Sequence, residues 1–102
     1  MWWANLAAPW GRRPVVLLSR DSAYPVRESV TVAPVTTAIR HIPVEVPLGP
    51  EEGLPRPCVA NLDNISTIDK NLLQERISSV SPQKLRAMEE AIRFALGMAT
   101  HN

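Results

Sequence analysis

The sequence predicts a small, mainly β protein that ends in one α-helix. Five or six short segments within residues 1–80 are either continuously apolar or alternate between apolar and polar residues, and proline and glycine separate them. Short strands at this spacing are typical of a small barrel or curled sheet. After residue 81 the apolar residues recur every three to four positions, which indicates an amphipathic helix. A chain of 102 residues forms one domain with a modest core. We therefore expect a single domain over residues 1–102, with the barrel in residues 1–80 and the helix in residues 81–98.

The first predicted strands are separated by one loop. Residues 1–6 are aromatic and apolar and form the first strand. Residues 7–13 contain Pro9 and Gly11, so we expect a loop there. Residues 14–19 form an apolar, β-branched run that is too short for a helix, and this run predicts a strand buried on both faces.

Further strands follow at short intervals. Residues 29–35 and 43–46 alternate between Val and polar or small residues, which is the period of a half-buried strand. Residues 47–57 are rich in proline and glycine and indicate a loop. Residues 58–60 and 74–80 are the last two strand candidates.

The helix has a clear start and end in the sequence. Ser81 is a good N-cap, and Pro82 suits the first helical position. Gly97 suits the residue just beyond the C-terminal end. The apolar residues that recur at helical spacing, and are expected to face the barrel, are Leu85, Met88, Ile92 and Leu96.

Composition limits the classes of function. The net charge of +1 excludes a polybasic protein held on its partner mainly by bulk charge. Nine of the eleven cations are Arg, however, and the planar guanidinium can bind a phosphate through two contacts. The single Cys58 excludes an internal disulfide and fits a reducing compartment. No signal peptide and no apolar run of about 18 residues are present, so we expect a cytoplasmic protein without a membrane segment. We also expect no metal and no cofactor.

Polar side chains flank three of the predicted strands. They are, in chain order, Arg12 and Arg13, Thr36 and Thr37, and Asn61 and Asp63. A sheet holds such residues in place and leaves them open to solvent. A cation, hydroxyl donors and a carboxylate together suit phosphodiester cleavage. The same residue types also occur at strand ends for structural reasons, so the residues alone leave both interpretations open.

The two histidines offer another kind of catalytic pair. A general acid and a general base must be held in a fixed geometry. His101 lies one residue from the C-terminal end, where nothing would hold it near His41. We therefore interpret both as exposed histidines.

Five segments, taken in order, resemble the signatures of the MazF/PemK family, the toxins of bacterial toxin–antitoxin pairs. They are residues 2–6 (WWANL), 13–19 (RPVVLLS), 32–37 (VAPVTT), 67–70 (TIDK) and 95–98 (ALGM). The resemblance implies an SH3-like barrel with a C-terminal helix, as in the CcdB-type toxins, and a homodimer. It also implies a metal-independent endoribonuclease that cleaves single-stranded RNA and is neutralised by a MazE-like antitoxin. In that reaction the ribose 2′-hydroxyl attacks the adjacent phosphate and leaves a 2′,3′-cyclic phosphate and a 5′-hydroxyl.

The resemblance also implies roles for particular residues. The catalytic arginine of the family matches Arg13, the catalytic threonine matches Thr36, and the carboxylate of PemK-type members matches Asp63, our candidate general base. The arginine that accompanies this carboxylate in PemK is replaced here by Asn61. The residues expected to contact RNA are Trp10, Arg12, Ser19, Thr37 and Asn61. Trp10 can either stack on a base or cap the barrel.

Two other functions fit the same fold. One is a gyrase poison like CcdB, although this chain lacks the Trp-Gly-Ile ending of that branch. The other is an inactive member that binds RNA without cutting it. The Arg-Pro motif at Arg13 and the paired threonines at Thr36 favour the nuclease.

Overall fold

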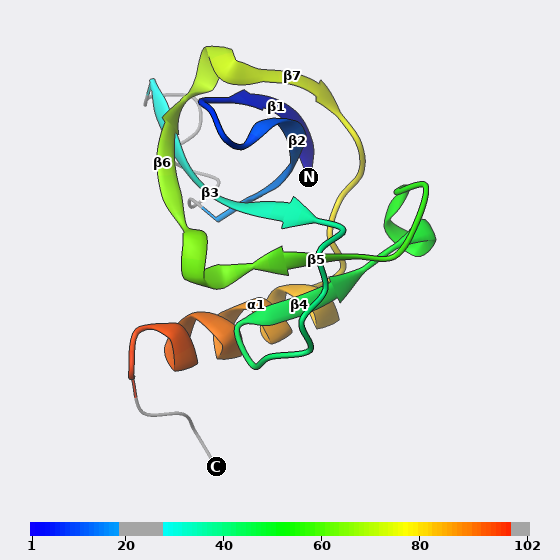
Figure 1. Cartoon of the computed structure of the whole chain (residues 1–102), viewed down its shortest axis with the longest axis vertical. Helices are drawn as coiled ribbons and strands as arrows, with labels where there is room; N and C mark the ends of the chain where they lie inside the picture. The colour runs from blue at the N-terminus through cyan, green and yellow to red at the C-terminus, as the bar shows by residue number, and fades with distance from the viewer. Residues whose placement is uncertain (19–27, 99–102) are drawn as a thin grey trace.

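The computed structural model describes residues 1–18 and 28–98 of the chain. Within these residues, seven strands form one antiparallel sheet and a single α-helix follows them (Figure 1). The strands are β1 (Trp2–Leu6), β2 (Gly11–Leu17), β3 (Ser29–Thr36), β4 (Glu45–Leu48), β5 (Cys58–Asn61), β6 (Ser66–Asp69) and β7 (Leu73–Arg76), and the helix is α1 (Pro82–Ala95). Three short 3-10 helices join them: η2 (Pro50–Glu52), η3 (Leu62–Asn64) and η4 (Lys70–Leu72). The predicted class, mainly β with a C-terminal helix, is confirmed.

The sheet curls around its longest strand, β3. The strand order is β4-β5-β3-β2-β1-β7, and β6 also pairs with β3. The first half of β3 pairs with β6 and its last residues pair with β5, so one strand joins two parts of the sheet. In Figure 1 the strands β1, β2, β3, β6 and β7 run around a ring, and β4 and β5 lie between that ring and α1.

The core has two parts, because the sheet buries both of its faces. Val16 and Ala33 belong to a cluster that includes Met88 and Ala91 of α1. Val15, the neighbour of Val16 in β2, belongs to a second cluster with Ala4, Val30 and Val32. Successive residues of a strand point to opposite faces, so an apolar run is buried on both sides. The predicted two-sided burial of this strand is confirmed at Val15 and Val16, which are 0% and 1% exposed.

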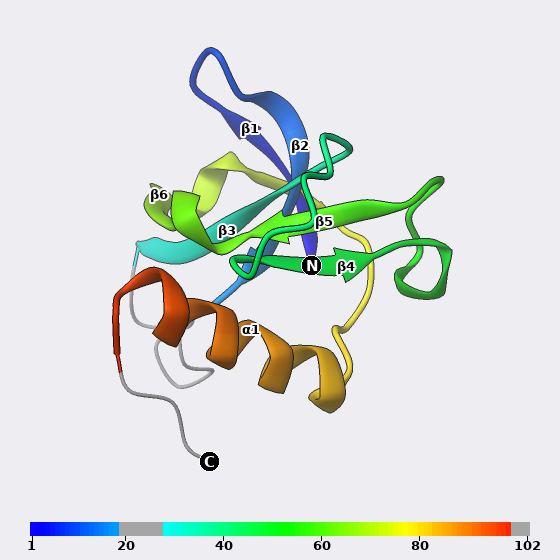
Figure 2. The same ribbon diagram turned by 60° about the horizontal axis from the view of Figure 1, so that its bottom comes forward.

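The ends of the helix are capped by the residues that the sequence predicts, and α1 itself covers Pro82–Ala95 of the expected residues 81–98. The Ser81 hydroxyl accepts a hydrogen bond from the Lys84 amide at 3.1 Å, which caps the N-terminal end. Gly97 has φ +69°, and its amide donates to the Phe94 carbonyl at 3.1 Å. The Met98 amide donates to the Arg93 carbonyl at 2.7 Å, which completes a Schellman motif. Figure 2 shows α1 lying along β4.

The hairpin between β1 and β2 differs from the prediction. A loop is expected over residues 7–13, but β2 begins at Gly11. Gly11 has φ +67°, and the Trp10 amide donates to the Ala7 carbonyl at 3.0 Å, so a short turn reverses the chain. Arg12 therefore lies within the ladder, opposite Asn5, instead of in a loop.

Two strands near the C-terminal half also differ. β6 is absent from the prediction because three of its four residues are exposed, which leaves no apolar alternation in the sequence. The last strand is predicted over residues 74–80, but β7 ends at Arg76. Beyond it, the amides of Ile77 and Ser78 both donate to the Met1 carbonyl, so the chain leaves the sheet there.

The described helix is not long and apolar enough to cross a membrane.

Two of the four residues expected to face the barrel are instead exposed: Leu85 at 42% and Leu96 at 66%. Met88, at 1% exposed, is the side chain that anchors the helix.

We expect Met88→Ala to lower the free energy of unfolding by about 2–5 kcal/mol, because it leaves a cavity between α1 and the sheet. Leu85→Ala is the matched control on the same helix, and it should cost less than about 1 kcal/mol, since that side chain is already exposed. Urea unfolding of both variants measures the difference. Equal losses would contradict this description of the core.

Candidate active site

Two arginines and two threonines from neighbouring strands line one cavity of about 230 Å³. They are Arg12 and Arg13 of β2, Thr36 at the end of β3, and Thr37 just after it. The register of the two strands explains why they meet. Val15 of β2 lies opposite Pro34 of β3. Extending this antiparallel register by two residues along each strand places Arg13 opposite Thr36.

Arg13 is held in place without using all of its donors. Its Nε donates to the Trp10 carbonyl at 2.8 Å, and its guanidinium carbon lies 5.0 Å from the centre of the Trp10 ring. Within the described residues its two terminal nitrogens make no hydrogen bond. The terminal edge of the fork is therefore available for an anion.

Arg12 is held in a similar way. Its Nε donates to Oε1 of Gln74 in β7 at 2.8 Å, and its guanidinium carbon lies 4.4 Å from the centre of the Trp3 ring. An aromatic face attracts a cation and restricts its rotation at the same time. Both arginines are thus oriented before any ligand arrives.

Thr36 opens a turn that fixes its side chain. Its Oγ1 accepts a hydrogen bond from the Ala38 amide at 3.1 Å. A hydroxyl that accepts in this way can still donate its own proton. Thr36 can therefore offer a hydrogen bond to a negatively charged oxygen in the cavity.

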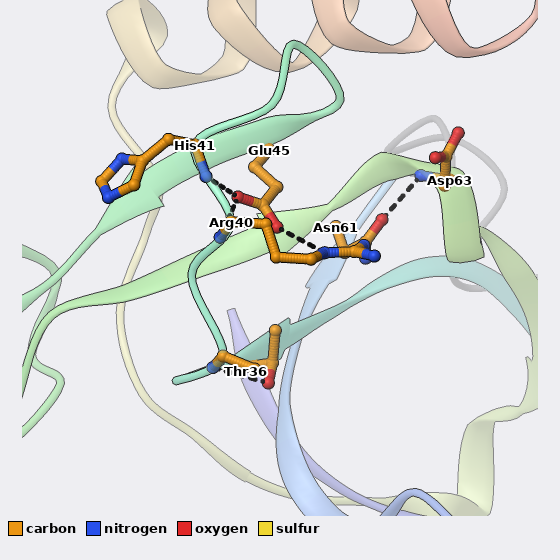
Figure 3. A network of polar contacts seen from close by, with 7 residues as sticks. Thr36, Arg40, His41, Glu45, Asn61 and Asp63 are labelled. Carbon is orange, nitrogen blue, oxygen red and sulfur yellow. Dashed lines mark hydrogen bonds and ion pairs between the residues drawn. The ribbon is translucent and has the colours of Figure 1, made fainter.

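A buried carboxylate holds the rest of this turn (Figure 3). The side chain of Glu45 is only 2% exposed. Its Oε1 accepts from the Arg40 and His41 amides, both at 2.9 Å, and its Oε2 lies 3.5 Å from Nε of Arg40. His41 has φ +56°, a conformation that is uncommon for residues other than glycine. Glu45 thus fixes the loop between Thr36 and β4.

The charge of Glu45 is stabilised by these contacts. Burial by itself would raise the pKa of the Glu45 carboxyl. The hydrogen bonds from the backbone and side chain of Arg40 and from the amides of His41 and Ile42 outweigh burial, so the pKa lies below its ordinary value of 4.5. Sequence reasoning missed this residue, since a Glu within an alternating strand gives no signal of its own.

Arg56 is a third cation on the wall of the same cavity, and sequence reasoning missed it too. It is exposed and lies between Pro55 and Pro57, in the segment interpreted only as a proline-rich loop. Burial raises the pKa of the Cys58 thiol beside it, and the positive charge of Arg56 partly opposes that rise. The sequence signal that could have indicated Arg56 is an arginine flanked by two prolines.

Other expected site residues lie elsewhere. Trp10 and Asp63 line a second, larger hollow of about 720 Å³ and do not line the cavity of Arg13 and Thr36. Asn61 is expected to contact RNA, but it is only 4% exposed, and its Oδ1 accepts a hydrogen bond from the Asp63 amide at 2.9 Å. Ser19 lies outside the described residues. Among residues 1–18 and 28–98, no three His, Cys, Asp or Glu side chains form a group that could hold a metal ion.

Together the fold and the cavity define a class of protein: a small antiparallel β protein with a cavity lined by arginines and threonine hydroxyls, which are groups able to bind an anion such as phosphate. Comparison with known proteins identifies the family. The chain matches the model of the PemK-like, MazF-like toxins of type II toxin–antitoxin systems over residues 1–96.

Curated relatives and solved structures agree with this match. The chain is 38% identical over 97 residues to the probable endoribonuclease MazF5 of Mycobacterium tuberculosis, covering 94% of this chain and 88% of the relative. It is 39% identical over 86 residues to endoribonuclease MazF3 of the same species, covering 84% of each.

The solved M. tuberculosis toxin MazF-mt6 has a TM-score of 0.90 and 34% identity, covering 97% of each chain. An endoribonuclease from a mycobacterial species, solved in complex with its cognate antitoxin, has a TM-score of 0.83 and 27% identity, covering 98% of this chain and 95% of that one. This chain belongs to the PemK-like, MazF-like toxin family.

We expect Glu45→Gln to lower the free energy of unfolding at pH 7 by about 1–3 kcal/mol, because the amide cannot replace the charge that the turn amides stabilise. A depressed carboxyl pKa stabilises the fold above the unfolded-state value of 4.5, and this stability is lost as pH falls through the folded-state value. The difference in the free energy of unfolding between wild type and variant should therefore shrink below about pH 4.5. Denaturant unfolding across pH 3–7 measures it, with the exposed Glu75→Gln as control. A difference that stays constant with pH would contradict the role of the charge.

Proposed function

We propose that this chain is the toxin of a type II toxin–antitoxin pair and that it cleaves single-stranded RNA at the cavity of Arg13 and Thr36. The observation that carries the proposal is that Arg13 of β2 and Thr36 of β3, which are neighbouring antiparallel strands, line one cavity, and this supports a guanidinium and a hydroxyl acting on the same phosphate. Membership of the family and the name endoribonuclease carried by the relatives support the same activity.

The reaction is an internal transfer at phosphorus. The 2′-oxygen of one ribose forms a bond to the adjacent phosphorus, and the bond from phosphorus to the 5′-oxygen of the next nucleotide breaks. The products are a 2′,3′-cyclic phosphate and a 5′-hydroxyl. One proton must leave the attacking 2′-hydroxyl, and another must reach the departing 5′-oxygen.

Arg13 and Thr36 act on the charge that develops between these two events. The guanidinium and the Thr36 hydroxyl stabilise the negative charge on the phosphorus oxygens, and Arg12, Thr37 and Arg56 bind the flanking phosphate groups. A guanidinium gives up its proton poorly, so electrostatic stabilisation is the main contribution of Arg13 to the leaving-group step. Asp63 is the candidate general base from the sequence, and its position in the neighbouring hollow makes a separate test of that role necessary.

Partners follow from the same family. We infer that a small MazE-like antitoxin neutralises this toxin, as an antitoxin is bound in the mycobacterial relative. We also infer a homodimer. The end of α1 supplies apolar surface that a second copy would cover, with Phe94, Leu96 and Met98 exposed at 58%, 66% and 53%. We place the toxin in the cytoplasm, where its RNA substrate is made.

The test is cleavage of defined single-stranded RNA by the purified chain in the presence of EDTA. We expect 2′,3′-cyclic phosphate and 5′-hydroxyl ends, and we expect Arg13→Ala to lower the single-turnover rate on the order of 10²–10³-fold. Arg86→Ala is the matched control, because Arg86 is an exposed arginine on α1 that lines neither cavity. The proposal fails if no RNA is cut, or if Arg13→Ala and Arg86→Ala cleave equally well. A gyrase supercoiling assay should show no inhibition, which separates the nuclease from a CcdB-like poison.

A further inference from the structure

The contact between Arg13 and Trp10 connects the arginine cavity with the second hollow. Arg13 lines the first cavity, and the Trp10 ring under its guanidinium lines the second. The backbone of Trp10 is also tied to Arg13, whose Nε donates to the Trp10 carbonyl. A chain of RNA whose phosphate sits on Arg13 therefore has the second hollow directly beside it.

The two cavities differ in charge. Of the described residues that line the first cavity, three are arginines and none is a carboxylate. Among the described residues that line the second, there are two carboxylates, Asp63 and Asp69, and no Lys, Arg or His. Like charges repel, so the second hollow disfavours a phosphate. Apolar side chains complete its wall, among them Leu6, Pro34 and Ile68. This lining suits an uncharged, partly apolar group that carries hydrogen-bond donors.

Asp63 is presented to the second hollow from a fixed backbone. The amide of Asp63 donates to Oδ1 of the buried Asn61, which caps η3. The Asp63 side chain is exposed and, within the described residues, has no hydrogen-bond or ion-pair partner. An ionised carboxylate only accepts hydrogen bonds, so its ligand must supply a donor.

We propose that this second hollow binds one nucleobase of the RNA substrate beside the cleaved phosphate, with the base against Trp10 and its exocyclic amino group donating to Asp63. The proposal rests on the proposed ribonuclease function and deepens it. Adenine, cytosine and guanine carry an exocyclic amino group, whereas uracil offers only a ring N3–H between two carbonyl oxygens that repel a carboxylate. Asp63 is thus a specificity residue that disfavours uracil at one position of the cleavage motif, and Trp10 supplies stacking that every base can use.

This role and the general-base role of Asp63 predict different results. A lost general base slows cleavage at every site and leaves the sequence preference unchanged. A lost base contact changes the preference at one position and leaves the other positions as they were. Asp63→Asn separates the two roles because its amide can donate to a uracil carbonyl as well as accept from an amino group.

The experiment sequences the 5′-hydroxyl ends that the full chain produces from a long RNA. We expect Asp63→Asn still to cleave RNA and to accept uracil at one motif position. Its discrimination against uracil at that position should relax on the order of tenfold. Glu75→Gln, an exposed carboxylate outside both cavities, should leave the motif unchanged. An unchanged motif in Asp63→Asn, with or without uniform slowing, overturns the proposal. Absence of cleavage by the wild type would instead overturn the ribonuclease function itself.

A second measurement uses the unaltered protein, so it does not depend on the folding of a variant. Short RNAs are made in which one motif base at a time lacks its amino group: inosine for guanine, purine riboside for adenine, or uracil for cytosine. We expect the wild type to lose cleavage on the order of tenfold at one position beside the cut. Equal cleavage of all these RNAs would overturn the proposal.

Discussion

The site depends on the register between β2 and β3. Val15, Val16 and Leu17 pair with Pro34, Ala33 and Val32, and this ladder sets which residues meet at its end. Because side chains alternate between faces, a slip of one residue would bury the wrong set and separate Arg13 from Thr36. The apolar run is buried on both sides, so packing on each face opposes such a slip. The same pairing therefore builds the core and brings Arg13 and Thr36 to one cavity.

Local charge, and not net charge, matters at the site. A chain with a net charge of +1 still gathers three arginines around one cavity. Trp3 and Trp10 hold two of them by their ring faces. Buried Glu45 fixes the turn after Thr36 by its hydrogen bonds to backbone amides. Groups oriented in advance cost no reorganisation when charge develops on the substrate, which is the usual source of electrostatic catalysis.

Much of the fold could be predicted, because the core strands and the helix have strong periodic signals. The apolar run in β2, the alternation in β3 and the caps at Ser81 and Gly97 were sufficient to predict the fold class, with the strands first and the helix last along the chain. β6 could not be found, since it is an exposed strand whose stability comes from pairing with β3.

The site was predicted only in part. Arg13 and Thr36 could be paired through motifs at strand ends, and their cavity agrees with that pairing. Asp63 could not be placed, because its position depends on the cap that Asn61 gives to η3. Arg56 was missed because it lies in a proline-rich loop that has no periodic pattern. Glu45 was missed because a Glu within an alternating strand gives no sign of the turn that it holds.

We propose that Arg13 and Thr36 act as one unit on the same developing charge. A double-mutant cycle on single-turnover RNA cleavage, with Arg13→Ala, Thr36→Val and both changes together, tests it most directly. If each single change costs on the order of 10²–10³-fold, we expect the double variant to be slower than the worse single variant by only a few fold. Losses that multiply in the double variant would show two independent contributions and would contradict it.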